Sequence, residues 1–398
     1  MEDLPLHGVR VVALGAFIAG NVCPQVLAEL GADVVKVESL NRPEALRGYF
    51  SLDHGTLLEP SGVQTTAMYS CLTRSLRSVG IEADRPGGSE TLRALMASAD
   101  VVIENMGPGV MERWGCCYAE LAAENPRLVM VSISGYGRTG PRGQYRAYGS
   151  SIANYLGLAS VWAFDGVHFD FVSAYHGAFA ALGALRRAEA TGTGTYIDLS
   201  QVEAGMAPMV PLYLDALVNG MPWSCDANEV PGAVLSAVVR CAGHDAWAAV
   251  ELEDLDDLRV LAEVLERPEL VAETRDDAAA KVAQVRGHLE AWASQLTPMQ
   301  VTVKLQHAGL AAAPVQDTED LWRDPQLRTR GAFVEVDHPE VGLLEQPQSP
   351  DRLSRTPGRV RGRSRRLGED SVEVLEDWLG LDADALDRLR ADGAVFQA

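Results

Sequence analysis

The first part of the chain alternates between short apolar runs and segments with the spacing of an amphipathic helix. Residues 9–14 and 33–38 are apolar runs that predict two strands, and 24–30 predict a helix between them. Gly31 follows that helix, and glycine is typical of the position after a helix C-terminus. A strand, a turn, a helix and a second strand make a βαβ unit, which implies parallel pairing with a right-handed crossover.

The same alternation continues further along the chain. The pattern predicts a helix over 92–98, strands over 100–104 and 128–134, an alanine-rich helix over 174–190 and a strand over 196–200. Repeated units of this kind favour an α/β fold, with a doubly wound, Rossmann-like parallel sheet in a large domain. Ligands of such sheets bind beyond the carboxyl ends of the strands, so we expect the functional residues at that edge.

The pattern changes in the second half of the chain. A stretch rich in loop-forming residues covers 217–230, and two strand-like runs followed by acidic helices predict a smaller α+β domain over 225–320. Proline and arginine punctuate 321–398, which we interpret as an extended return segment ending in a helix. With 1–200 as the large domain, this segment is expected to complete that domain.

Composition and charge exclude several classes of protein. The 398 residues include 34 Lys+Arg and 55 Asp+Glu, for a formal net charge of −21, which argues against binding to nucleic acid or an anionic membrane. The six cysteines show no CxxC pair and no metal-ligand spacing, and no apolar run reaches the about 18 residues of a membrane span. We therefore expect a cytoplasmic protein with no metal and no permanently bound cofactor.

Several segments, in this order, resemble the class III coenzyme A transferase family (CaiB/BaiF type), which includes formyl-CoA transferase. They are residues 27–38 (LAELGADVVKVE), 103–115 (IENMGPGVMERWG), 132–141 (SISGYGRTGP), 191–198 (TGTGTYID) and 313–315 (APV). Each fragment alone is a weak signal, whereas their order and spacing along most of the chain are specific. The resemblance implies transfer of coenzyme A from an acyl-CoA donor to a carboxylic acid acceptor, and an interlocked homodimer.

The resemblance also implies a catalytic aspartate upstream of the helix that ends in Thr-Gly-x-Gly. Counting back without gaps from Gly192 reaches Asp170, whereas Asp165 would need a five-residue gap. In the implied mechanism the Asp170 carboxylate forms an acyl anhydride and then an aspartyl-CoA thioester, which is covalent catalysis. From the residues alone, Asp170 is also a typical helix N-cap, which is the structural alternative.

Coenzyme A carries a pyrophosphate and a 3′-phosphate, and arginine binds phosphate bidentately. The resemblance implies contacts with the coenzyme at seven positions, namely Ala19, Arg47, Arg77, Asn105, Met106, Arg113 and Arg146. The tetrahedral stages of acyl transfer also need hydrogen-bond donors for a developing oxyanion. Backbone N–H groups of 135–137 and of 18–20 are both candidates for that role.

Departures from the family pattern bear on the substrate and on the reaction. Ile18 stands where formyl-CoA transferase has Gln, and Asn21 where Pro is usual, which favours a bulkier or more apolar acyl group. The α-methylacyl-CoA racemases of the same family use a His at the position of Gly149, and no His occurs between His54 and His168. That absence favours a transferase over a racemase, and a catalytically silent coenzyme-binding protein is the third alternative.

Overall fold

The computed structural model describes residues 4–47, 66–158, 167–220, 228, 230 and 232–397. The chain divides into two compact units, Met1–Trp223 with Gly331–Ala398, and Ser224–Arg330. Residues 321–330, which the sequence assigned to the return segment, thus group with the second unit. Asp165, the alternative aspartate, lies outside the described residues.

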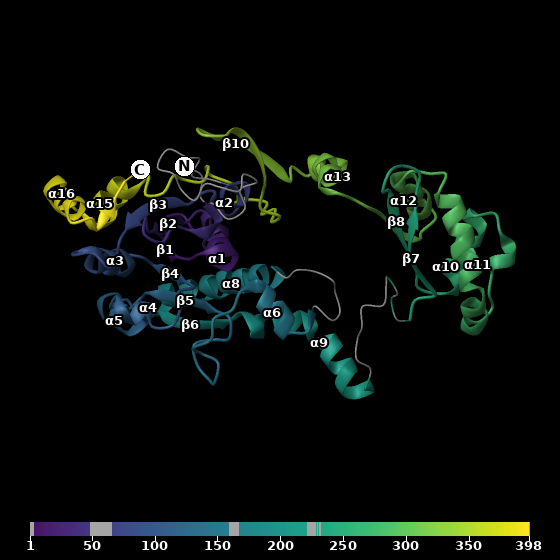
Figure 1. Cartoon of the computed structure of the whole chain (residues 1–398), viewed down its shortest axis with the longest axis horizontal. Helices are drawn as coiled ribbons and strands as arrows, with labels where there is room; N and C mark the ends of the chain where they lie inside the picture. Colours follow the sequence, from purple (N-terminus) through teal and green to yellow (C-terminus); the bar gives the residue numbers. More distant parts are fainter. Residues whose placement is uncertain are drawn as a thin grey trace. The chain divides into compact units, whose positions relative to one another are not determined.

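A seven-stranded sheet forms the centre of the first unit (Figure 1). Its strands are β1 (Arg10–Leu14), β2 (Asp33–Glu38), β3 (Arg77–Ile81), β4 (Val101–Glu104), β5 (Val129–Ser134), β6 (Thr195–Ser200) and β12 (Val395–Phe396). Their order is β12-β3-β2-β1-β4-β5-β6, and every pair is parallel except β12 with β3. The predicted α/β fold with a parallel-dominated sheet is confirmed. The strand order reverses between β1 and β4, which is where such sheets bind ligands.

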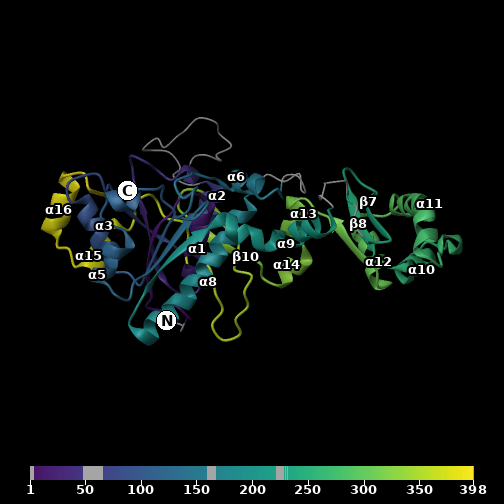
Figure 2. The same cartoon turned by 90° about the horizontal axis from the view of Figure 1, so that it is seen from below.

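Helices cover both faces of this sheet (Figure 2). Successive side chains of a strand point to opposite faces, so Val11 and Ala13 pack in one core and Val12 and Leu14 in the other. The first core contains α1 (Phe17–Glu29), α2 (Ala67–Thr73) and α8 (His168–Thr191). The second contains α3 (Gly88–Ala97), α4 (Val110–Arg113), α5 (Tyr118–Glu124), α15 (Ser371–Leu379) and α16 (Ala383–Ala391).

Several helices of the first unit differ from the sequence prediction; α8, for example, begins at His168 and not at residue 174. The first helix begins at Phe17, not at residue 24, although Pro24 is typical of a helix start; the proline lies inside α1 and removes only one backbone donor there. The helix α9 (Gln201–Asn219) extends into the stretch that was expected to be a loop. It packs with α6 (Gly149–Tyr155) and the start of α8 in a separate apolar cluster. α16 and β12 at the C-terminus were not predicted.

The second unit has a three-stranded antiparallel sheet of β7 (Leu235–Arg240), β8 (Trp247–Leu252) and β9 (Ala311–Val315). Its helices are α10 (Leu255–Val264), α11 (Arg275–Ala293), α12 (Pro298–His307), α13 (Thr318–Arg323) and α14 (Pro325–Thr329). It buries a core of its own. In the first unit, β10 (Phe333–His338) and β11 (Gly342–Pro347) form an antiparallel pair within the predicted return segment.

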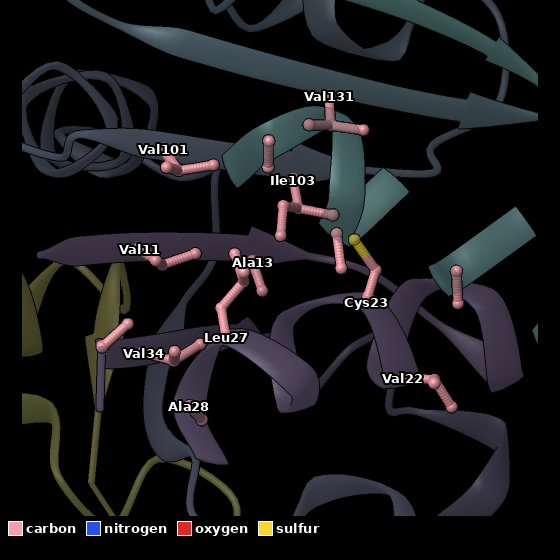
Figure 3. Packing of buried hydrophobic residues seen from close by; sticks show 14 of the residues in the cluster. Val11, Ala13, Val22, Cys23, Leu27, Ala28, Val34, Val101, Ile103 and Val131 are labelled. Atoms are coloured by element: carbon pink, nitrogen blue, oxygen red, sulfur yellow. The ribbon is translucent and has the colours of Figure 1, made fainter. Parts of the chain in front are cut away.

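The helices α1 and α8 lie against each other on one face of the sheet, and Gly177 of α8 permits the close contact. A Cβ atom at this position would lie 3.1 Å from Cys23 Sγ of α1 and 3.6 Å from a methyl group of Val131 on β5. Figure 3 shows the Cys23 sulfur directed away from α1 toward this helix. The contact fixes the position of α8 along the axis of α1, and therefore the position of the first turn of α8.

Candidate active site

The carboxyl edge of the parallel sheet collects the first turns of three helices. α1 follows β1 and α9 follows β6, so both begin at this edge. α8 ends just before β6, at the amino edge of the sheet, and it runs antiparallel to the strands, so its first turn also lies at the carboxyl edge. From the contact between Cys23 and Gly177, the helical rise of 1.5 Å per residue puts Ala19 about 6 Å and Asp170 about 10 Å toward this edge. Asp170 and the first turn of α1 therefore both lie on the carboxyl-edge side of this contact.

Asp170 is the third residue of α8, and the N-cap position belongs to Val167. Helix capping therefore does not account for Asp170. Its neighbour Phe169 is buried in the cluster between α6 and α9, and this packing fixes the orientation of the first turn. The Asp170 carboxylate accepts a 2.7 Å hydrogen bond from Gln201 Nε2.

Burial raises the pKa of Asp170 above its usual value, and the hydrogen bond from Gln201 acts in the opposite direction. No basic side chain is paired with this carboxylate among the residues that the structure describes. Without a nearby cation, partial burial makes the ionised form of this carboxylate less stable than it is in water. Such a group is more basic and more nucleophilic than an exposed aspartate.

The start of α1 has an unusual backbone that a buried ion pair holds in place. Phe17 adopts φ +57°, a conformation that is costly for a bulky residue and is concentrated at functional sites. Its N–H donates to Glu44 Oε1 at 2.9 Å, and Glu44 Oε2 pairs with Lys36 Nζ at 3.0 Å. Lys36 also donates to Asn21 Oδ1 at 2.7 Å. The network holds the turn so that the N–H groups of the next residues, which lack an intrahelical acceptor, point out of the helix.

Asn105 lies directly after β4 and clamps the turn between β1 and α1. Its side chain accepts from Ala16 N and donates to Ala16 O, both at 2.9 Å. A Cβ atom at Gly20 would lie 2.8 Å from the Asn105 amide group, so only glycine allows this approach. The predicted coenzyme contact Asn105 is thus brought to the predicted oxyanion turn, and Ala19 lies buried in the same turn.

The segment before α6 crosses the same edge of the sheet. Ala147 fills the space beside Gly135, and Tyr148 meets the ring of Phe17 edge-on with centroids 5.3 Å apart. Arg146 is exposed, and its Nε atom lies 4.0 Å from the position that a Cβ would occupy on Gly107. Within the described residues, its guanidinium makes no ion pair or hydrogen bond. Arg146 is therefore available to a ligand at this edge.

A second buried carboxylate supports the loop after β5. Glu104 accepts two hydrogen bonds from Arg138, at 2.8 and 2.9 Å, one from Ser132 Oγ and one from Met106 N. Burial raises the pKa of Glu104 despite the opposing attraction of Arg138. Arg138 N donates in turn to both carboxylate oxygens of Asp198. Met106, a predicted coenzyme contact, is therefore tied by its backbone to this network.

Arg47 has a different environment from the one that the sequence suggested. Its guanidinium is buried, pairs with Glu38 at 2.6 and 2.9 Å, and contacts Tyr69 and the carbonyl of Arg365. Burial disfavours the Glu38 anion, but Arg47 and its hydrogen bonds outweigh that effect and lower the pKa of Glu38. In this structure Arg47 supports the fold and presents no exposed guanidinium to a phosphate.

The other two predicted arginines differ in exposure. Arg77 lies at the amino end of β3, where it pairs with Asp33 at 3.0 Å and Glu373 at 3.3 Å. It is thus at the edge of the sheet opposite to Asn105. Arg113 lies in the short helix after Gly109, largely exposed, with its Nε 3.9 Å from the carboxylate of Asp84 and its guanidinium 5.6 Å from the Trp114 ring.

Sequence reasoning missed three residues of this edge, namely Gln201, Glu44 and Lys36. Gln201 comes directly after the carboxyl end of β6, so the rule for strand ends already pointed to its position. The pair Lys36–Glu44 has no such signal, because both residues resemble ordinary surface charges until the fold buries them. The side chain of Ile18 is buried in the core, whereas Phe17 is the exposed side chain of the turn. The expectation about the acyl group therefore loses its basis in Ile18.

Among the residues that the structure describes, no helix is long and apolar enough to cross a membrane. In the same part of the chain, no group of three or more His, Cys, Asp or Glu side chains could hold a metal ion.

Comparison with known proteins adds sequence and structural relatives. The sequence model of CoA-transferase family III matches residues 6–371. Succinyl-CoA–D-citramalate CoA-transferase of Chloroflexus aurantiacus is 29% identical, over 98% of both chains. A probable CoA-transferase, Rv1866 of Mycobacterium tuberculosis, is also 29% identical, but the chain spans only 50% of that protein's length. Among solved structures, a CAIB/BAIF family protein from Brucella suis superposes with a TM-score of 0.82 at 25% identity, covering 95% of this chain and all of that one.

Proposed function

The chain belongs to CoA-transferase family III, and on that premise we propose that it moves coenzyme A from an acyl-CoA donor to a carboxylic acid through covalent intermediates on Asp170. The observation that carries the proposal is the half-buried Asp170 carboxylate, which faces no cation among the described residues and lies in the first turn of α8, at the edge of the sheet where α1 also begins. The exchange of one thioester for another is close to isoenergetic, so no ATP is needed.

The proposed reaction proceeds by four displacements. Asp170 attacks the donor thioester, the C–S bond breaks, and coenzyme A leaves as the thiolate, which gives an acyl-aspartyl anhydride. The thiolate then attacks the aspartyl carbonyl, the donor acid leaves as a carboxylate, and aspartyl-CoA remains. The acceptor carboxylate reverses the two steps. One difficult displacement thus becomes several easier ones.

The N–H groups of Ile18 and Ala19 are the proposed donors for the oxyanion on the substrate carbonyl. They belong to the first turn of α1, where helical N–H groups lack intrahelical acceptors and the helix dipole favours negative charge. The contacts of Phe17, Glu44 and Asn105 hold this turn before substrate binds. A fixed donor is more effective than a mobile one because it needs no reorganisation during the reaction.

For the coenzyme, we propose phosphate contacts from Arg146 and Arg113. Both are exposed and follow strand ends at the carboxyl edge, and a protein of net charge −21 needs such local positive charge to hold phosphates. Asn105 would shape the site through its clamp on the backbone of Ala16. Arg47, which is buried, has a supporting role in this proposal.

The acyl group is proposed to contact Phe17 and Tyr148. Their rings are exposed and meet edge-on beside the proposed oxyanion donors, which suits an acyl chain with an apolar portion. The relative from Chloroflexus aurantiacus is named for succinyl-CoA as a donor. We therefore propose succinyl-CoA as the first donor to test, beside formyl-, acetyl- and benzoyl-CoA.

We also propose a cytoplasmic homodimer in which the chains interlock. Support comes from α9, which exposes the apolar side chains of Met206, Leu214 and Leu217 in the single chain. Sedimentation at micromolar concentration should give a dimer, and a stable monomer would contradict this part of the proposal.

The test of the function is covalent labelling of the enzyme. We expect one of the four thioesters to leave coenzyme A bound to the wild-type chain, detected by intact mass and mapped to Asp170. The variant Asp170→Ala should bind coenzyme A with unchanged affinity and show neither the label nor transfer. Asp276→Ala, which removes an exposed acid from the first turn of α11, is the matched control and should be labelled normally. Labelling that persists in Asp170→Ala would refute the assignment.

A further inference from the structure

Gln201 is held against the nucleophile by two hydrogen bonds from one amide nitrogen. Its Nε2 donates to Asp170 Oδ1 at 2.7 Å and to Ser173 Oγ at 3.1 Å. Ser173 is in turn fixed because its hydroxyl donates to the backbone carbonyl of Asp170 at 3.0 Å. An ionised carboxylate only accepts hydrogen bonds, so the nitrogen of the Gln201 amide, and not its oxygen, must face Asp170.

The position of Gln201 is set by the backbone and not by a flexible loop. It is the first residue of α9, directly after the N-cap Ser200, whose side chain accepts from Glu203 N. The next residue, Val202, donates its N–H to Gly135 O. Gln201 is itself buried, with a relative exposure of 6%. A buried donor fixed in this way costs no reorganisation when charge appears beside it.

The hydrogen bond makes the two oxygens of Asp170 inequivalent. Gln201 holds Oδ1, so Oδ2 is the oxygen with a free lone pair for attack on the donor thioester. In the anhydride that results, Oδ2 bridges the two acyl groups and Oδ1 is the carbonyl oxygen of the aspartyl half. When the coenzyme A thiolate attacks Cγ, the electron pair of the carbonyl bond moves to Oδ1. Collapse re-forms that bond and expels the donor carboxylate with Oδ2.

We propose that Gln201 is a catalytic residue whose Nε2–H stabilises the oxyanion on Asp170 Oδ1 each time the aspartyl carbonyl is attacked. The inference rests on the proposed function, and it adds a second oxyanion site to the reaction. The first turn of α1 would serve the substrate carbonyl, and Gln201 would serve the enzyme's own carbonyl.

This role predicts unequal effects on the two half-steps. When Asp170 attacks the donor, its carboxylate loses negative charge, so the hydrogen bond from Gln201 weakens and does not lower that barrier. When the thiolate attacks the aspartyl carbonyl, Oδ1 gains charge and the hydrogen bond strengthens. Loss of one oxyanion donor typically slows a step by about 10²–10³-fold. Loss of the Gln201 donor should therefore slow the second step and leave the rate of the first step within about tenfold of the wild-type rate.

The experiment is a rapid-quench single turnover with the thioester that labels the wild-type enzyme. Release of free coenzyme A reports the first step, and enzyme-bound coenzyme A, measured by intact mass, reports the second. Gln201→Met removes the donor at similar volume. We expect a normal burst of free coenzyme A, a 10²–10³-fold slower appearance of aspartyl-CoA, and an accumulated anhydride that hydroxylamine traps. Gln326→Met makes the same change at an exposed glutamine of α14 and is the matched control, with both steps expected within tenfold of the wild type.

The outcomes separate this inference from the proposed function. If no thioester labels the wild-type chain, the proposed function fails. If the wild type is labelled and Gln201→Met forms aspartyl-CoA at the wild-type rate, the function stands and the catalytic role of Gln201 is wrong. Equal slowing of both steps would show that Gln201 only positions Asp170, and that result also overturns the inference. Binding of coenzyme A with unchanged affinity by Gln201→Met would exclude misfolding as the cause.

Discussion

The buried pair of Lys36 and Glu44 allows a sharp test of how the first turn of α1 is held. The substitution Glu44→Gln keeps the size of the side chain but removes its charge. Both members of the pair are almost fully buried, with side-chain exposures of 3% and 2%. The variant thus leaves the Lys36 ammonium without its counter-ion, and it weakens the acceptor for Phe17 N.

The expected loss of stability follows from this burial. Removing one partner of a buried ion pair typically costs about 3–5 kcal/mol, because an uncompensated charge remains in the interior. A domain is stable by about 5–15 kcal/mol, which exceeds this loss over most of the range, so the variant should still fold but unfold at a lower urea concentration. The same change at Glu373, an exposed partner of Arg77, should cost less than about 1 kcal/mol because solvent screens the pair.

The assay is a urea titration of the free energy of unfolding, with hydrogen exchange of the α1 amides as a report on the first unit alone. The double variant Lys36→Met with Glu44→Gln should be more stable than Glu44→Gln, because the unpaired charge is gone. Transfer activity should fall in both variants, since the amide oxygen of glutamine is a weaker acceptor for Phe17 N and holds its φ of +57° less firmly. If Glu44→Gln costs no more than Glu373→Gln, the reasoning about this network is refuted.

The remaining predictions concern pH and the coenzyme. Burial raises the pKa of Asp170 in the folded state above its value in the unfolded chain. The folded protein is therefore more stable with respect to this group at a pH below the unfolded-state pKa, and it loses that stability as the pH rises through the folded-state pKa. At neutral pH Asp170→Asn should therefore unfold at the same or a higher temperature while losing transfer, and kcat/KM of the wild type should fall on the acid side at a pH above the usual aspartate range. Calorimetry that shows a lower Tm for this variant would contradict the sign. By calorimetric titration, Arg146→Gln should weaken coenzyme A binding about 10–100-fold, the value of a hydrogen bond to a charged group. Arg186→Gln, about 24 Å along α8 from Asp170, should bind as the wild type does, and equal affinity of both variants would refute the phosphate role of Arg146.

Much of the first unit could be predicted because its signals are local. Mainly apolar runs of five to seven residues predicted β1, β2, β4, β5 and β6 to within one residue at each end. Helix ends were harder to place, since Pro24 suggested a start that lies inside α1. The helix α9 carries two prolines and exposes several apolar side chains, so its sequence lacks the usual helical pattern. Its formation depends on packing against α6 and α8, which the local pattern does not record.

For the candidate site, spacing along the chain led to Asp170, to Asn105 and to the turn after β1. These positions follow from where strands end, and strand ends are visible in the pattern of apolar residues. The sequence could not show that Arg47 is buried against Glu38, or that Gln201 donates to Asp170. Both facts depend on pairs of side chains from different elements.

By itself, the sequence determined most strands of the large parallel sheet and the family to which the chain belongs. It could do so because each of these depends on the periodicity of neighbouring residues or on motifs of fixed length. Only the tertiary structure decided which charges are buried, which arginines are exposed and which donor faces Asp170. Those properties arise when helices and strands pack, because burial sets the energy of a charge and brings together side chains that lie far apart in the chain.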